Sequence, residues 1–405
     1  MIISVNKHNI EFENFISFLM AFYIEIPIIN QILIAFSGSL SIMTQFYMLC
    51  IVVFFVFGML EIVKTTVKVD IPVLLVFLLL TVYYCFTTLI QRDSTLTINN
   101  YIVYTLVPLV LPILFKINST VFIKSMMIIP CLGIVKLNSI FIIDSNSYIS
   151  MGLSYAILAP VLASLVFLVT LYRAQKHKVF YTLVLLINFV YLVEMVVYGS
   201  RGTVLSVLLC IITMWLFKYD CENNRVTIRG KRTLLLSLAA SVIILNGQNI
   251  LFGVNNFFVK RGITVQALEK SIRLLRENSL FNGRNSILEI AFDEIMKKPF
   301  VGHGMSTFEY YTGINYPHNF LVQFLFDGGL LLFGIIVIVF LVRTIKVFKH
   351  LSKNQYFLYV YLFFLAVPGA LFSGDIWENS KFWFLMGWIL TLCSVKEKKN
   401  NQYEK

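Results

Sequence analysis

The sequence has few charges for its length and a large excess of apolar residues. Only 13% of its 405 residues are charged, while 58% are hydrophobic and the mean hydropathy is +0.81. A soluble domain averages about 25% charged residues. A chain with half that charge could not keep its surface solvated, so the composition excludes an ordinary soluble protein and predicts a membrane protein.

Several motifs are missing as well. The six cysteines are spread singly with no C-x-x-C pair, so neither a disulfide framework nor a zinc site is predicted. The glycine patterns that hold nucleotides, G-x-x-x-x-G-K and a G-x-G-x-x-G after a strand, do not occur. We therefore expect no metal and no bound cofactor.

Twelve apolar runs predict an all-α polytopic membrane protein that forms one domain over residues 1–405. The runs are about 17 to 26 residues long, enough to cross roughly 30 Å of hydrocarbon. Pro108, Pro112 and Pro130 interrupt the fourth and fifth runs. The twelve runs are 14–36, 40–62, 71–90, 98–115, 119–135, 149–172, 179–198, 201–218, 233–252, 317–342, 355–373 and 377–394.

The positive charges predict how these helices are oriented. The net charge of +12 would suggest nucleic-acid binding in a soluble protein, but the positive-inside rule explains it in a membrane protein. With a cytoplasmic N-terminus, 21 of the 33 Lys and Arg residues lie in inner segments. The short outer loops then hold Arg92, Lys136, Arg201 and Lys381. We expect both termini in the cytoplasm and no nucleic-acid partner.

One long outer loop, residues 253–316, follows the ninth run. Residues 265–278 have apolar side chains at helical spacing, which predicts an amphipathic helix. A second amphipathic helix is predicted to start at Ser286, because Ser286 and Glu289 have the spacing of a capping box. Both helices are expected to lie over the membrane bundle.

His318 lies in the triplet Pro317-His318-Asn319, where the long loop enters the tenth apolar run. A histidine at such a boundary can be a helix-end residue bonded to a backbone carbonyl. It can also be a general base, since imidazole titrates near neutral pH and can take a proton from a hydroxyl. Asn319 is expected to orient either His318 or the substrate.

Arg201 lies between a Gly-Ser pair and Gly202, at the outer start of the eighth run. Its guanidinium can reach lipid headgroups or, because the neighbouring residues are small, it can bind a bulky anion. Glu194 lies seven residues earlier, within the seventh run. A carboxylate inside a membrane is a functional candidate, and Arg201 is its expected partner.

Arg284 directly precedes the second predicted amphipathic helix. A helix N-terminus offers unpaired N–H groups, and an adjacent arginine adds a bidentate phosphate donor. The alternative is an exposed charge in a solvated loop. Asp327, about nine residues into the tenth run, is expected to make a buried contact that fixes the helix or to support the site. His303, between two glycines, is expected to pack a turn.

These stretches together resemble the O-antigen ligase and polymerase superfamily, whose members are multi-pass bacterial membrane enzymes. The resemblance covers residues 198–334, and residues 151–156 have a similar look. It rests on the order of five stretches: Tyr-Gly-Ser-Arg201-Gly, Asn-Gly-Arg284, Lys-Pro-Phe-Val-Gly-His-Gly, His318-Asn-Phe-Leu and Asp327-Gly-Gly-Leu.

The resemblance implies an inverting, metal-independent glycosyltransferase at the outer face of the bacterial cytoplasmic membrane. It implies that His318 deprotonates an acceptor sugar hydroxyl, and that Arg201 and Arg284 bind the leaving pyrophosphate. The implied partners are an undecaprenyl-pyrophosphate-linked oligosaccharide donor and acceptor and membrane lipids. A flippase and a chain-length regulator are further candidates.

Three functions are compatible with these observations. We favour a repeat-unit polymerase for a surface polysaccharide such as O-antigen or capsule. The alternative is an O-antigen ligase that moves polymer to a lipid or another envelope acceptor, because the Arg-x10-Gly motif of some polymerases is missing here. A flippase or transporter of lipid-linked sugars is the alternative from another class, although transporters carry their charges in a central cavity.

Overall fold

The computed structural model describes residues 2–37, 42–64, 71–88, 94–133, 147–198, 200–220, 225–262, 264–277, 284–348, 351–372 and 374–403. Within these ranges the chain is almost entirely helical, which confirms the all-α class. Arg92, Lys136 and the Asn-Gly pair before Arg284 lie outside these ranges.

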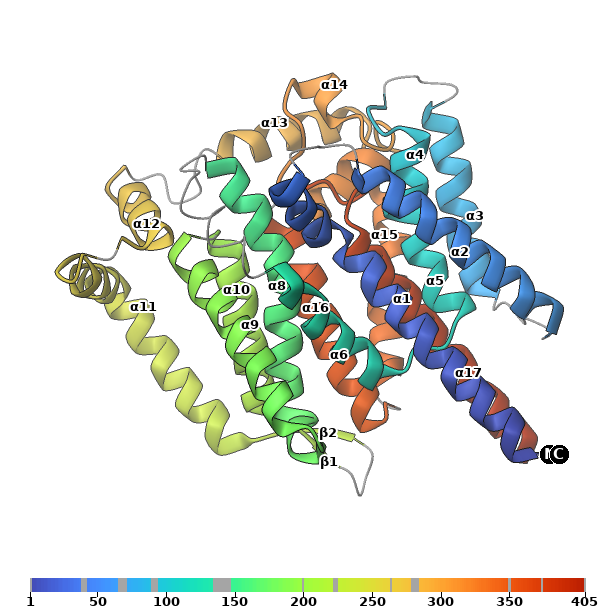
Figure 1. The fold of residues 1–405 in the computed structure, drawn as a ribbon. Helices are drawn as coiled ribbons and strands as arrows, with labels where there is room; N and C mark the ends of the chain where they lie inside the picture. Colours follow the sequence, from blue (N-terminus) through green and yellow to red (C-terminus); the bar gives the residue numbers. More distant parts are fainter. Residues whose placement is uncertain are drawn as a thin grey trace.

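The helices form a bundle in which the long elements run up and down (Figure 1). The first half comprises α1 (Ile2–Ser37), α2 (Ile42–Lys64), α3 (Ile71–Phe86), α4 (Ile98–Asn100), η2 (Tyr101–Leu106), α5 (Val107–Leu114), α6 (Ser119–Ile128), η3 (Ile129–Gly133), α8 (Ser147–Thr170), η4 (Tyr172–Ala174) and α9 (Lys178–Tyr198). The second half comprises α10 (Arg201–Leu216), β1 (Phe217–Asp220), β2 (Arg225–Ile228), α11 (Gly230–Val259), α12 (Gln266–Arg276), α13 (Arg284–Lys297), α14 (Phe308–Thr312), α15 (Phe320–Phe348), α16 (Lys353–Phe372) and α17 (Ser380–Tyr403).

Fewer helices than the predicted twelve are suited to cross a membrane. Among the described residues, five helices are long and apolar enough: Glu11–Asn30, Gly152–Thr170, Lys178–Val197, Phe320–Phe348 and Lys353–Phe372. The number rises to six if the two arms of α11, which are bent by 78°, count as one span. Five more apolar helices have only 10–17 residues. The prediction of twelve spans was therefore wrong when spans are counted by helix length and composition. The length of an apolar run in the sequence does not equal the length of the helix that it forms.

Two of the predicted runs show why. The run 201–218 ends its helix at Leu216, where the chain changes to strand β1 and pairs with β2 in an antiparallel hairpin. The run 98–115 is divided into α4, a π-helical turn and α5, which contains Pro108 and Pro112. These three elements follow one another without a gap as the helical segment Ile98–Leu114, which belongs to the shorter apolar helices.

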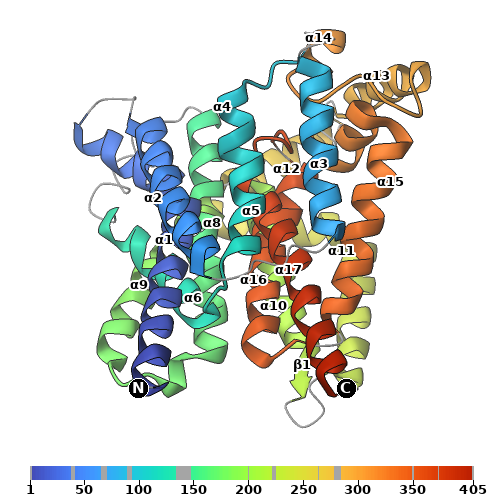
Figure 2. The ribbon, with the colours of Figure 1, turned by 90° about the vertical axis from the view of Figure 1, so that its right-hand side faces the viewer.

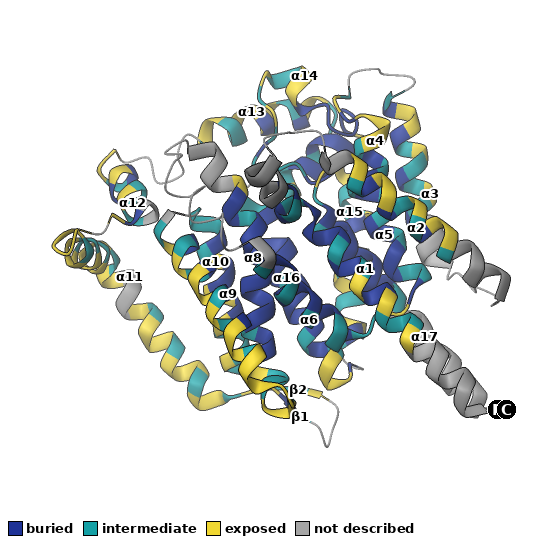
Figure 3. Cartoon of the chain, viewed as in Figure 1, coloured by how far each residue is buried: buried dark blue, intermediate teal, exposed yellow. Residues whose placement is uncertain are grey.

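The chain termini and the long loop lie at opposite ends of the bundle. Both termini and β1 are at the lower end, whereas α13 and α14 are at the upper end (Figure 2). The helix α16 is buried along most of its length, while α9 and α11 expose apolar side chains (Figure 3). Exposed apolar faces of this kind are suited to contact lipid.

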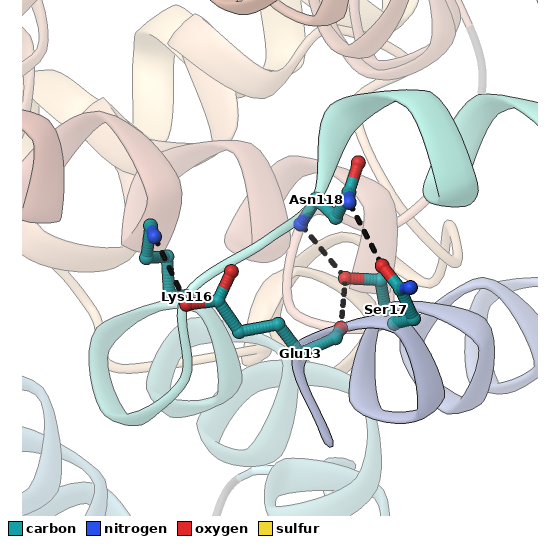
Figure 4. Close-up of polar contacts among 5 residues, drawn as sticks. Glu13, Ser17, Lys116 and Asn118 are labelled. Carbon is teal, nitrogen blue, oxygen red and sulfur yellow. Dashed lines mark hydrogen bonds and ion pairs between the residues drawn. The ribbon is translucent and has the colours of Figure 1, made fainter. Parts of the chain in front are cut away.

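Polar contacts tie the short segment before α6 to helix α1 (Figure 4). The Lys116 ammonium is 2.9 Å from a Glu13 carboxylate oxygen, and the Asn118 N–H donates to the Ser17 hydroxyl at 2.8 Å. Asn118 also caps α6, because its side-chain oxygen accepts from the N–H groups of Thr120 and Val121. These contacts fix where α6 begins relative to α1.

The long loop agrees with its prediction at α12 and differs from it in three other respects. The helix α11 continues to Val259, so the loop begins at Lys260 rather than at residue 253. The helix α12 lies where the first amphipathic helix was expected, with Ile272 buried. The helix α13 begins at Arg284, so Ser286 lies inside it and is not its N-cap. A further short helix, α14, was not predicted.

The chain packs against itself where α15 is broken at Gly329. Gly329 has φ of 60° and ψ of −166°, which is not helical. The carbonyls of Pro299 and Phe300 accept hydrogen bonds from Leu330 and Leu331 at 2.8 and 3.2 Å. Two residues between α13 and α14 thus supply the acceptors that the helix lacks at the break. A Cβ on Gly329 would lie 2.3 Å from the carbonyl carbon of Phe300, so only glycine fits.

Replacing Gly329 with alanine should destabilise the protein by about 2–4 kcal/mol, since it combines a left-handed backbone with a backbone clash. Thermal unfolding of the purified protein in detergent measures this. Gly334→Ala is the matched control, because the same helix leaves nothing within 4 Å of a Cβ there. Equal melting temperatures for the two variants would contradict the account of the break.

Candidate functional site

Arg201 is the first residue of α10, and both of its neighbours are held by α8. Ser200 caps α10, because its hydroxyl accepts from the Thr203 N–H at 3.3 Å. The Ser200 N–H donates to the Ser154 hydroxyl at 3.3 Å. On the other side, the Tyr155 hydroxyl lies 2.5 Å from where a Cβ of Gly202 would be. The small residues around Arg201 therefore serve close packing against α8.

Arg284 is the first residue of α13, and its charge reaches both of the other predicted site residues. Its positive charge acts on the Arg201 guanidinium and on the His318 ring. The structure therefore brings together Arg201, Arg284 and His318, which are far apart in the sequence.

Lys270 in α12 is a third cation near Arg201 and Arg284, and it was not predicted from the sequence. Its pKa is lowered first by burial and then by the charges of Arg201, Arg273 and Arg284. The helix α12 contacts α9, the helix that ends three residues before Arg201. The sequence offered no motif at Lys270, because only the return of α12 onto the bundle brings it to the arginines.

Among the described residues, no ion pair joins Arg201, Lys270 or Arg284 to a carboxylate. We define the cation cluster as Arg201, Lys270 and Arg284. Like charges that are held together without a counter-ion repel one another, so the cluster favours binding of an anion with more than one charge.

The His318 backbone is in the left-handed region, with φ of 57°. This conformation is uncommon for a residue with a Cβ, and residues strained in this way cluster at functional sites. The ring of Tyr316 packs edge-on against the His318 ring, with centroids 4.5 Å apart. The loop thus holds the imidazole in one position despite the backbone strain.

Asn319, not His318, caps helix α15. The Asn319 side-chain oxygen accepts from the N–H groups of Leu321 at 3.0 Å and Val322 at 3.4 Å. Asn319 therefore has a structural task, which differs from the expectation that it orients the histidine or the substrate. Among the described residues, the buried Nδ1 of His318 has no hydrogen-bond partner. Among the described residues, no hydrogen bond joins the His318 ring to a backbone carbonyl. The structure therefore does not support the interpretation of His318 as a helix-end residue bonded to a carbonyl.

The surroundings of His318 favour its neutral form. Burial lowers the pKa of the imidazole below its usual value of 6.5, and the Arg284 charge lowers it further. A neutral imidazole has one nitrogen that can accept a proton. At neutral pH the ring is therefore in the form that a general base requires.

Glu194 does not pair with Arg201, contrary to expectation. Its Oε2 atom is buried and has no hydrogen-bond partner among the described residues. The prediction assumed one continuous helical face from Glu194 to Arg201, but α9 ends at Tyr198 and α10 starts at Arg201. Because the chain turns between them, the spacing of seven residues no longer brings the two side chains together.

Asp327 makes the buried contact that was expected of it. It is fully buried in α15, and the Trp377 indole N–H donates to its carboxylate at 2.5 Å. Its backbone carbonyl accepts from the Gly304 N–H at 2.8 Å and from the Tyr83 hydroxyl. Asp327 therefore fixes the loop of residues 302–304 and the start of α17 to α15, close to the break at Gly329.

Asp375 connects the same elements and was not singled out from the sequence. Gln323 donates to its carboxylate at 2.7 Å, Ser306 at 3.0 Å and the Trp377 backbone N–H at 2.8 Å. Burial raises the pKa of Asp375 to about 6. Gln323 lies one turn beyond Asn319, so this network supports the start of α15 just after His318.

His303 has the packing role that was expected. Its Nε2 lies 2.8 Å from the Glu294 carbonyl, and its ring stacks on Phe326 with centroids 4.7 Å apart. The described residues contain no group of three or more histidine, cysteine, aspartate or glutamate side chains that could hold a metal ion.

Comparison with protein-family models finds no match for this chain, and comparison with curated proteins finds none either.

Proposed function

We propose that this protein is a membrane glycosyltransferase that polymerises repeat units of a surface polysaccharide carried on undecaprenyl pyrophosphate. The supporting observation is the cation cluster next to a histidine that favours its neutral form. A pyrophosphate that leaves from a sugar is an anion of the kind such a cluster selects, and the transfer also needs a base.

In the proposed reaction an acceptor sugar hydroxyl attacks the anomeric carbon of the donor sugar. The new carbon–oxygen bond forms on the face opposite the pyrophosphate, so the configuration inverts. The bond to the pyrophosphate breaks, and the lipid pyrophosphate leaves with the electron pair. His318 accepts the hydroxyl proton, while Arg201, Lys270 and Arg284 stabilise the charge that develops on the leaving group.

In this proposal the cation cluster faces away from the cytoplasm of a bacterial cytoplasmic membrane, and both termini are cytoplasmic. Support comes from the position of the termini, which lie together at the end of the bundle opposite α13 (Figure 2). Two termini at the same end correspond to an even number of membrane crossings. The basic residues Lys218, Arg225 and Arg229 also lie around the β-hairpin at the end where the termini lie. A basic cytoplasmic side follows the positive-inside rule.

Analysis of lipid-linked glycans after deletion of the protein tests the proposal. If the protein is a polymerase, its deletion should cause single repeat units to accumulate on undecaprenyl pyrophosphate while long chains disappear. Long chains that remain on undecaprenyl pyrophosphate would instead indicate the ligase, and repeat units that never reach the outer face would indicate a flippase. An unchanged glycan profile would refute all three. Restoring the wild-type protein is the control.

Arg284→Gln should move the acidic limb of the pH–activity profile to higher pH. The neutral His318 ring is the active form, so activity falls as the pH drops through its pKa. The Arg284 charge lowers that pKa, so its removal raises the pKa toward 6.5 and protonation begins at higher pH. The rate of polymer formation is measured across pH and normalised to each variant's maximum.

Arg276→Gln is the matched control for this profile, because Arg276 is exposed at the end of α12 and its guanidinium lies over the Phe252 ring. An acidic limb that stays in place in Arg284→Gln, or moves to lower pH, would rule out the electrostatic link between Arg284 and His318.

A further inference from the structure

The interior of the bundle contains two ionisable residues, Glu25 and Lys381, that the proposed reaction does not use. Glu25 in α1 is 1% exposed, and its Oε1 has no hydrogen-bond partner among the described residues. The charge of Lys381, near the start of α17, acts on Glu25. The sequence analysis assigned Lys381 to a short outer loop, but its ammonium points into the protein. Ionisable residues in such a position are costly and are rarely kept without a task.

The Lys381 ammonium contacts α8 at Tyr155, and Tyr155 and its neighbour Ser154 contact the start of α10. The ammonium donates a hydrogen bond to the Tyr155 carbonyl at 2.9 Å. The Tyr155 side chain fits between Gly202 of α10 and Gly369 of α16. A Cβ on Gly202 would lie 2.5 Å from the Tyr155 hydroxyl, and a Cβ on Gly369 would lie 3.2 Å from the Tyr155 ring. The preceding residue, Ser154, accepts the hydrogen bond from Ser200.

The two residues on either side of Arg201 are therefore held by two consecutive residues of α8. We infer that Lys381 is a positioning residue that sets the place of the Arg201 guanidinium through Tyr155 and Ser154. This inference rests on the proposed function, in which Arg201 binds a pyrophosphate. A misplacement of about 1 Å at such a site can cost roughly a hundredfold in rate.

Binding of inorganic pyrophosphate to the full-length protein in phosphatidylcholine nanodiscs tests the inference. Neutral lipid is used so that anionic headgroups do not compete for the cations. The main variant is Glu25→Gln combined with Lys381→Met, which removes the donor to Tyr155 without leaving a buried charge unpaired. We expect it to bind pyrophosphate roughly tenfold more weakly than the wild type while melting at a similar temperature.

Two further variants separate positioning from general packing. Lys381→Arg keeps a cationic N–H donor and should restore most of the binding. Thr391→Val removes a hydrogen bond from α17 to the Pro112 carbonyl of α5, at 2.9 Å, and should bind like the wild type. Weak binding by Thr391→Val, equal to that of the double variant, would overturn the inference in favour of general packing of α17.

Arg201→Ala distinguishes failure of this inference from failure of the proposed function. If Arg201→Ala binds weakly and the double variant binds normally, Lys381 does not position Arg201 and the inference alone is refuted. If Arg201→Ala binds normally, the anion site is refuted and the inference falls with it. Should the double variant fail to fold, Gly202→Ala displaces Tyr155 from α10 without a change of charge. Wild-type binding in Gly202→Ala would also overturn the inference.

Discussion

Replacing His318 with asparagine is expected to lower the rate of glycan transfer by about 10²–10⁴-fold, which is the usual contribution of a general base. Asparagine tolerates the left-handed backbone that His318 adopts, with φ of 57°, so the loop should keep its shape. Its amide cannot accept the proton of an acceptor hydroxyl. The measurement is the conversion of single lipid-linked repeat units into longer chains, with membrane insertion of the variant checked in parallel.

His177→Asn is the matched control, since this histidine is exposed just before α9 and is outside the site. It should leave the transfer rate unchanged. Polymer of normal length and amount in His318→Asn would show that the imidazole does not act as the base. His318→Ala should lose activity as well, but it also strains the backbone, so asparagine gives the cleaner result.

Replacing Arg201 with lysine is expected to lower the transfer rate at least about tenfold, and Arg201→Gln about 10²–10³-fold. Lysine keeps the charge but loses the planar fork that can bind two phosphate oxygens at once. Because Gly202 and Ser200 are packed against α8, the lysine ammonium cannot gain reach from a backbone shift. The same conversion of repeat units to longer chains is measured, together with the apparent KM for the lipid-linked donor.

Arg261→Lys is the control for this series. Arg261 is exposed, and its guanidinium lies 3.6 Å from the centre of the Phe257 ring. A loss of activity in Arg261→Lys as large as in Arg201→Lys would mean that arginines outside the cluster matter equally, and that the cluster has no special role. Full activity in Arg201→Gln would mean that Arg201 only anchors the start of α10.

The candidate site could be predicted in part because its main residues are chemically conspicuous where they occur. Arg201 and Arg284 are cations beside small residues, and His318 follows a proline at the start of an apolar run. Lys270 could not be found in this way, because it lies among other charged residues on an amphipathic helix. Glu194 was misjudged, since its spacing from Arg201 is meaningful only if the helix between them is continuous.

The sequence by itself determined that the chain is helical and apolar, because hydrophobic content and period follow directly from composition and order. It also determined which arginines and which histidine stand out. Only the tertiary structure decided that Lys270 joins the arginines, that Asn319 caps α15 in place of His318, and that Lys381 bonds to the Tyr155 carbonyl of α8. The reason is physical: hydropathy reports the preference of one segment for its surroundings, whereas side-chain partners depend on how helices remote in sequence pack together.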